Sequence, residues 1–127
     1  FLPIHPNPAV KKHEHLLKHV KVVDPVPYDE FTKMLAECKF AITDSGGLQE
    51  ELSFFGKLCI VCREQTERIM GLGTFSYLCL KPKGLEELFN KVNDSYNTVM
   101  GMPCPYGNGK SAETILKLIK DGYIERF

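Results

Sequence analysis

The chain has 127 residues, 43% of them hydrophobic, which is enough for one ordinary core and leaves little room for two independent domains. Its 16 basic and 16 acidic residues cancel, so no net charge attracts nucleic acid or an anionic membrane surface. No apolar run approaches the roughly 20 residues that span a bilayer, and the first residues lack the pattern of a secretory leader. We therefore expect a cytoplasmic protein that binds neither nucleic acid nor membrane.

Short apolar runs alternate with helical stretches, which predicts an α/β fold with a parallel sheet flanked by helices, in a single domain over residues 1–127. The first run begins at Phe1 rather than at a methionine and reads as a strand already under way, so we expect a fragment of a longer protein. The expected strands, with bounds uncertain by about 2 to 4 residues, are 1–5, 20–24, 39–43, 58–62 and 75–80.

The strand expected at 39–43 runs into Asp44, Ser45, Gly46 and Gly47, at the place where open α/β sheets bind their ligands. Two glycines remove the Cβ atoms that would keep a ligand away, and the helix that follows aims free amides and the positive end of its dipole at the same place. An anion suits this turn. A plain strand-to-helix turn with Asp44 or Ser45 as the helix cap explains the same residues equally well.

The helix after the turn carries an acidic residue in an unusual place. Leu48, Leu52 and Phe55 form one apolar stripe at 100° per residue, and Glu50 points away from it as a solvated acid. Glu51 lies about 60° from the centre of the stripe, where a carboxylate loses solvation unless donors reach it. The hydroxyls of a ribose beside a bound diphosphate are such donors, so the helix favours a nucleotide site.

The five cysteines lie scattered, as expected of reduced thiols in a cytosolic protein, and we predict no disulfide. Cys59 and Cys62 have the spacing of a metal or redox pair. They lie in an apolar run predicted to be a strand, where residues three apart point to opposite faces. We therefore interpret them as core cysteines and predict no metal site.

The remaining helices follow the same periodicity. Phe31, Leu35 and Cys38 recur at intervals of four and three and predict a helix over 28–39. Helices are also expected at 84–92 and at 111–122. The Pro- and Gly-rich stretch 101–109 suits a loop at the rim of the fold.

Five motifs along the chain carry a family resemblance. They are PIHPNP at 3–8, TDSGGLQEE at 43–51, GK at 56–57, TER at 66–68 and PYGNGKSAE at 105–113. Their order and near spacing resemble the UDP-N-acetylglucosamine 2-epimerase family over essentially the whole chain. The resemblance implies a Rossmann-like domain, the C-terminal nucleotide-binding half of a GT-B-like fold of two domains, whose other half is the missing N-terminal domain of the same enzyme.

The resemblance also implies a role for individual side chains. The turn residues contact the diphosphate, the second Glu of the motif binds the ribose, the motif His and Arg lie near the diphosphate, and the residue after YDE lies against the uracil. The implied substrate-binding residues are His5, Phe31, Ser45, Gly46, Gly47, Glu51 and Arg68.

Simpler interpretations of these residues remain open. His5 can cap the end of the first strand, and Arg68 can pair on the surface with Glu64 or Glu67. Lys57 is interpreted as a turn lysine. The loop that holds Tyr106, Asn108 and Lys110 carries only a weak signal for phosphate binding.

As the resemblance implies it, the family inverts C2 of the sugar in UDP-GlcNAc to give UDP-ManNAc, by eliminating UDP and adding it back. Charge builds on the departing UDP, and Ser45 and Arg68 are expected to stabilise it. The acids that move the C2 proton precede this chain in the family. We therefore expect no catalytic residue, cofactor or metal here, but binding of UDP or UDP-sugar without turnover, and a homodimer among the implied partners.

Three other functions fit the same features. A hydrolysing relative would release ManNAc and UDP, a GT-B glycosyltransferase would hold its nucleotide donor in the same place, and a non-catalytic domain would only sense the nucleotide.

Overall fold

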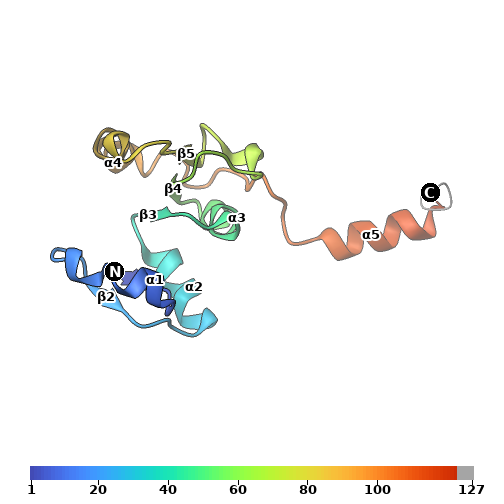
Figure 1. Ribbon diagram of the computed structural model, residues 1–127. Helices are drawn as coiled ribbons and strands as arrows, with labels where there is room; N and C mark the ends of the chain where they lie inside the picture. Colours follow the sequence, from blue (N-terminus) through green and yellow to red (C-terminus); the bar gives the residue numbers. More distant parts are fainter. Residues whose placement is uncertain (123–127) are drawn as a thin grey trace. The chain divides into compact units, whose positions relative to one another are not determined.

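The computed structural model describes residues 1–122 of the chain. Contacts between residues group into two compact units, Phe1–Met34 and Leu35–Phe127. The first unit contains β1 (Leu2–Pro3), α1 (Pro8–Lys11), the 3-10 helix η1 (Glu14–Leu16), β2 (Val22–Val23) and the beginning of α2 (Tyr28–Glu37). Figure 1 labels α1, β2 and α2. Within residues 1–122, no helix has the length and apolar character needed to cross a membrane.

The first unit is built on a short parallel pair of strands. Leu2 lies opposite Val22 in the β1–β2 register. The helix α1 begins for two local reasons: Asn7 accepts a hydrogen bond from the amide of Ala9 at 2.9 Å, and Pro8 stands at the first helical position. This cap fixes the segment that follows the PIHPNP motif.

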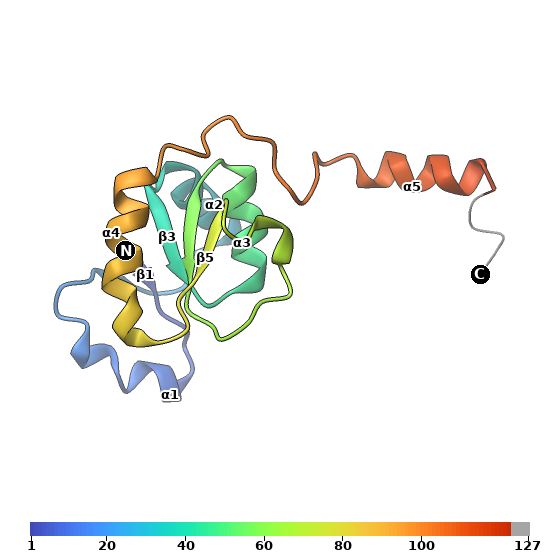
Figure 2. The ribbon, with the colours of Figure 1, turned by 90° about the horizontal axis from the view of Figure 1, so that it is seen from above.

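The second unit holds a three-stranded parallel sheet in the order β3-β4-β5. Its elements are β3 (Phe40–Thr43), α3 (Gly46–Phe54), β4 (Leu58–Val61), the 3-10 helix η2 (Ile69–Gly71), β5 (Ser76–Leu78), the 3-10 helix η3 (Pro82–Gly84), α4 (Leu85–Ser95) and α5 (Ser111–Lys120). The helices α3 and α4 lie on opposite sides of these strands (Figure 2).

The central strand β4 explains where the core of this unit lies. All four of its residues are buried, because a strand between two neighbours and two helices is covered on both faces. Leu58 and Ile60 join Val92 of α4 in one cluster. Alternation along the strand directs Cys59 and Val61 to the other face, the side of α3.

The predicted α/β fold of parallel strands and flanking helices is confirmed, and each observed strand lies within its expected range. The sequence predicted one sheet, whereas the five strands found within residues 1–122 form two. The helix predicted at 111–122 begins at Ser111, and Gly122 follows its end with a positive φ of 71°. A single domain over 1–127 stays a prediction.

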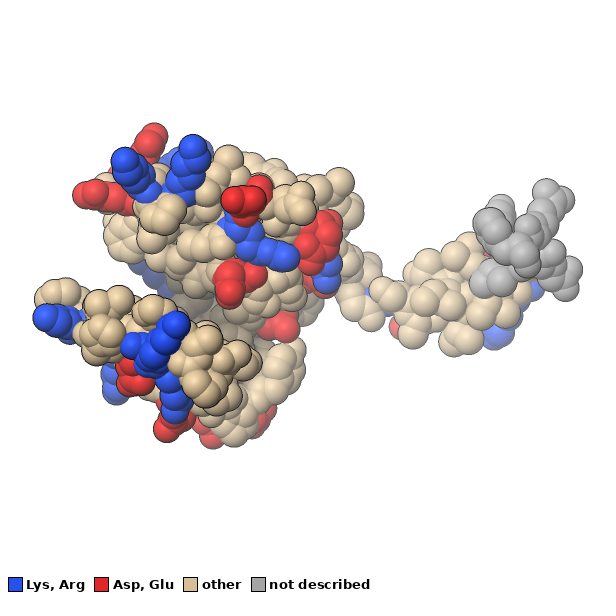
Figure 3. Space-filling model, viewed as in Figure 1, with Lys and Arg blue, Asp and Glu red and all other residues tan. Residues whose placement is uncertain are grey.

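The charges on the surface are mixed in sign. Figure 3 shows acidic and basic side chains interspersed on the visible face, without a broad patch of either sign. This distribution agrees with the balanced composition of the sequence.

We expect Ile60→Ala to lower the free energy of unfolding by about 2 to 5 kcal/mol, because it removes methyl groups from a fully buried site. The matched control is Ile69→Ala, since Ile69 is 68% exposed and its truncation should change the free energy by less than about 0.5 kcal/mol. Urea unfolding of both variants measures the difference. Equal losses would contradict the assignment of this core.

Candidate anion site at the β3–α3 turn

The turn after β3 presents the first amides of α3 to the edge of the sheet. Ser45 is the N-cap in an extended conformation, and its side chain makes no capping hydrogen bond within the described residues. Its own amide donates to the Thr43 hydroxyl at 3.0 Å. Among residues 1–122 the amides of Gly46 and Gly47 have no acceptor, as expected in a first helical turn. These two amides are therefore available to an anion.

The two glycines of the turn have different surroundings. A Cβ atom on Gly46 would lie 2.5 Å from Oε1 of Glu67, whereas a Cβ on Gly47 would meet only the Ser45 hydroxyl, at 4.0 Å. A carboxylate therefore already lies against the start of the helix, where the helix dipole favours negative charge. A hydrogen bond from its own backbone, and after it the charges of Arg63 and Arg68, lower the pKa of Glu67.

Arg68 lies in the middle of a small network of charges. Its Nη1 donates to Glu67 at 2.9 Å and its Nε donates to Glu50, while Arg63 reaches the other oxygen of Glu67 at 3.4 Å. The surface ion pair with Glu67 that the sequence left open is thus present. Glu50, interpreted as a solvated acid, keeps 44% of its side chain exposed, and it also pairs with Arg68 because the loop after β4 brings Arg68 over the first turn of α3.

The loop that carries Arg68 is fixed by two polar side chains. Gln49 is 1% exposed, and its amide donates to the Thr66 hydroxyl at 2.9 Å. The same hydroxyl accepts a hydrogen bond from the Arg68 amide at 3.1 Å. Sequence reasoning missed Gln49 and Thr66, although both lie inside the quoted motifs. The sequence carried no signal for Gln49, because it lies off the predicted apolar stripe of Leu48, Leu52 and Phe55 and its burial appears only in the structure.

Tyr106 connects the loop of the PYGNGKSAE motif to the loop that carries Arg68. Its hydroxyl donates to the Arg68 carbonyl at 2.8 Å and accepts from the Gly71 amide at 3.1 Å. A Cβ on Gly71 would lie 2.9 Å from that hydroxyl, so the glycine permits the contact. Two residues on, Asn108 accepts from the Lys110 amide at 3.1 Å, just before α5. The loop thus supports the site through Tyr106 in this structure.

The other predicted site residues lie in two places. Glu51 is half-buried in α3, one turn beyond the glycines. His5 and Phe31 belong to the first unit, where Nδ1 of His5 accepts a hydrogen bond from the Asn7 amide at 3.1 Å. Ser45, the glycines, Glu51 and Arg68 belong to the second unit. The ligand contacts expected of all these side chains stay predictions.

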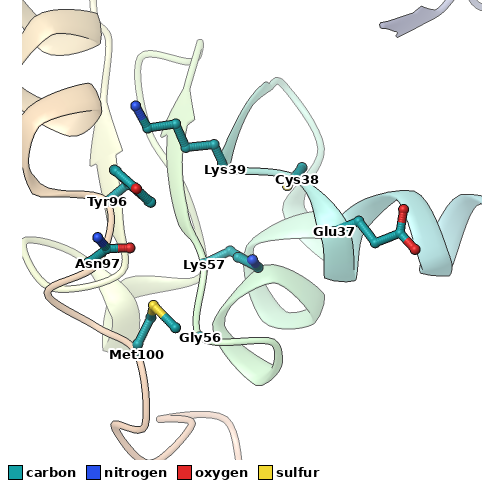
Figure 4. A pocket seen from close by; sticks show the side chains of 8 residues that line it. All are labelled: Glu37, Cys38, Lys39, Gly56, Lys57, Tyr96, Asn97 and Met100. Carbon is teal, nitrogen blue, oxygen red and sulfur yellow. The ribbon is translucent and has the colours of Figure 1, made fainter.

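A separate cavity of about 410 Å³ lies at the opposite edge of the sheet (Figure 4). Lys39 and Lys57, which immediately precede β3 and β4, line it together with Cys38 and Tyr96. The Lys39 ammonium lies 4.3 Å from the centre of the Tyr96 ring. Lys57 therefore lies away from the candidate anion site at Ser45. It stands in the short connection between α3 and β4, in agreement with its interpretation as a turn lysine.

Among residues 1–122, no three His, Cys, Asp or Glu side chains are grouped so that they could hold a metal ion.

Comparison with known proteins gives consistent matches. The sequence model of a family described as UDP-N-acetylglucosamine 2-epimerase matches residues 1–120. The UDP-N-acetylglucosamine 2-epimerase of Escherichia coli O157:H7 is 34% identical over 131 residues, which cover 96% of this chain and 35% of the relative. That of Campylobacter jejuni is 30% identical over 136 residues, 94% of this chain and 34% of the relative.

Solved structures agree with these matches. A UDP co-structure of MnaA from S. aureus has a TM-score of 0.80 at 27% identity and covers 98% of this chain and 36% of its own. The Methanocaldococcus jannaschii UDP-GlcNAc 2-epimerase in complex with UDP-GlcNAc and UDP has a TM-score of 0.76 at 27% identity, with 93% and 34% covered. The chain thus spans about a third of the length of these proteins.

We expect Tyr106→Phe to cost about 1 to 3 kcal/mol of folding free energy, because it leaves the Arg68 carbonyl and the Gly71 amide without the hydroxyl between them. Urea unfolding measures the loss. The matched control is Tyr77→Phe, since the ring of Tyr77 packs at the core and beneath the Lys91 ammonium. If the two variants unfold alike, the hydroxyl does not hold the loop.

Proposed function

The chain belongs to the UDP-N-acetylglucosamine 2-epimerase family, and from that membership we propose that it is the UDP-binding part of an enzyme that interconverts UDP-GlcNAc and UDP-ManNAc. The observation that carries the proposal is the turn at Ser45, where two helix amides and the close approach at Gly46 favour an anion. Relatives that share this fold include structures with UDP and UDP-GlcNAc bound.

The diphosphate is proposed to take the place that the Glu67 carboxylate occupies against Gly46. Glu67 is an exposed residue, and its carboxylate lies at the end of a flexible side chain, so the carboxylate can turn toward solvent. Arg68 has five N–H donors and uses Nε for Glu50 and Nη1 for Glu67. Replacing Glu67 by a phosphate oxygen would keep the pair with Glu50, which fixes the orientation of the guanidinium.

The nucleoside is proposed to follow from the position of the diphosphate. Glu51 lies one helical turn beyond the glycines, where its carboxylate would accept hydrogen bonds from the two ribose hydroxyls. Phe31 would lie against the uracil, and His5 would lie near the diphosphate. His5 belongs to the PIHPNP motif and Phe31 follows the YDE segment, and their contacts form part of the proposal.

The reaction is proposed to proceed by elimination of UDP and its re-addition to the other face of the sugar. Negative charge develops on the departing diphosphate, and preset donors act most strongly where that charge appears. These donors would be Ser45, the amides of residues 46 and 47, and Arg68. The acids that move the C2 proton would come from the N-terminal part of the enzyme, so this chain alone would bind UDP without turnover.

One relative bears on the choice of sugar. A UDP-2,3-diacetamido-2,3-dideoxy-D-glucuronate 2-epimerase of Pseudomonas aeruginosa is 45% identical over 67 residues, 52% of this chain. A site that binds the UDP group would serve UDP-GlcNAc and the diacetamido-glucuronate equally well, because both carry the same UDP. The hydrolysing reaction, which releases ManNAc and UDP, would also use the same contacts, so the sugar and the fate of the intermediate would be decided outside this chain.

We expect the chain to bind UDP in isothermal titration and to show no epimerase turnover in a coupled assay of the same sample. Titration with uridine is the control, because a diphosphate held at the turn should make UDP bind much more tightly than the nucleoside. Failure to bind UDP, or turnover by the chain alone, would contradict the proposal.

We expect Glu51→Ala to weaken UDP binding by about 1 to 3 kcal/mol through the loss of polar contacts to the ribose. The matched control is Glu86→Ala, which removes an exposed carboxylate from the first turn of α4. Titration of 2′-deoxy-UDP provides a second test, because Glu51→Ala should affect it less than UDP. Unchanged UDP affinity in Glu51→Ala would exclude the ribose contact.

A further inference from the structure

Two cysteines face each other at the carboxyl edge of the sheet. Cys62 follows the last residue of β4 and Cys79 follows the last residue of β5. Val61 and Leu78 are register partners, and the Cys79 amide donates to the Val61 carbonyl at 2.8 Å, so the ladder continues to this point. The two cysteines therefore occupy opposed positions on neighbouring strands, about 4.8 Å apart as paired residues are.

Both side chains lie on the same face of the sheet. Cys79 belongs to the core cluster with Ile60 of β4, and Cys62 has the same parity as Ile60. Paired positions of this kind fall within the separation of about 4.4 to 6.8 Å that a disulfide spans between its Cα atoms. Cys59 and Cys62, whose spacing was noted in the sequence, do not meet this condition, because the strand directs these residues to opposite faces.

The two thiols differ in accessibility. The interpretation of Cys62 as a core cysteine is wrong, because Cys62 follows the end of β4 and is exposed. Cys79 is 7% exposed, so an oxidant in solution meets Cys62 first. Partial burial, followed by the neighbouring thiol of Cys79 and the charge of Asp44, raises the pKa of Cys62. Cys59, on the other face, is buried, and burial raises its pKa to about 12. Of these three cysteines, Cys62 alone has an accessible thiol, and Cys79 is its partner on the neighbouring strand.

We infer that Cys62 and Cys79 form a site of reversible disulfide formation, oxidised by a low-molecular-weight disulfide such as oxidised glutathione. The Cys62 thiolate attacks one sulfur of that disulfide, and one glutathione thiolate leaves. The Cys79 thiolate then attacks Sγ of Cys62 and releases the second glutathione. The two protein thiols lose two electrons and two protons, and the small disulfide gains them as two thiols.

The cross-link would close the segment 63–78, which carries Arg68 and η2. The amide of Cys62 also donates to the Thr43 carbonyl at 2.8 Å, one residue before the turn at Asp44. Oxidation would therefore tie both ends of the loop next to the candidate anion site. The inference rests on strand register and accessibility, and it holds whether or not the turn binds UDP.

The test is a peptide map of the whole chain after incubation with oxidised glutathione, alkylation and tryptic digestion without reductant. The peptides with residues 58–63 and 69–83 should be joined, and dithiothreitol should separate them. Because the first peptide also contains Cys59, Cys59→Ala should keep the cross-link, whereas Cys62→Ser and Cys79→Ser should abolish it. Cys38→Ser is a second control and should keep it.

Two results would overturn the inference. One is a map in which Cys62 and Cys79 stay unlinked, whether free or each joined to glutathione. The other is a cross-link that persists in Cys62→Ser and is lost in Cys59→Ala. Circular dichroism of Cys62→Ser should match the unaltered chain, because the exposed position tolerates a hydroxyl, so loss of the cross-link in that variant reports the missing thiol.

Discussion

The parallel pairing of β3, β4 and β5 is the constraint on which the rest of the second unit depends. Parallel strands point the same way, so their carboxyl ends meet at one edge of the sheet. That edge receives the turn at Ser45, the loop with Arg68 and the residue Cys79, although they are distant along the chain. The complete burial of β4 makes this register costly to change, since a shift by one residue would exchange its two buried faces.

At this edge, electrostatic interactions decide which group lies against the helix. The Glu67 side chain is 54% exposed, and exposed ion pairs such as those with Arg63 and Arg68 contribute little to stability. A diphosphate carries more charge and can accept several charge-assisted hydrogen bonds, each roughly twice as strong as a neutral one. An incoming diphosphate would therefore replace the carboxylate at small cost, with Glu50 still holding the guanidinium.

Local periodicity was enough to predict the strands and the helices α2 to α5, because helix and strand leave patterns of 3.6 and 2 residues in the sequence. It did not predict α1 or the 3-10 helices, which are too short to show a period. The turn at Ser45 was predictable for the same reason, since it lies where one pattern changes into the other. The bond from Tyr106 to Arg68 joins residues 38 apart, and the bond from Gln49 to Thr66 joins residues 17 apart. No local pattern encodes such contacts, and the opposition of Cys62 and Cys79 appears only once the register is known.

The two glycines of the turn show how alike residues can serve different purposes. A Cβ on Gly46 would lie 2.5 Å from Oε1 of Glu67, at the movable end of that side chain, and 3.7 Å from Nη1 of Arg63. Gly47 meets no close neighbour, so packing does not require it to be glycine. Glycine in the first turn of a helix costs conformational entropy relative to alanine. At position 47 that cost has no compensation in the contacts of the protein itself, and access to the amide by a bound anion would supply one.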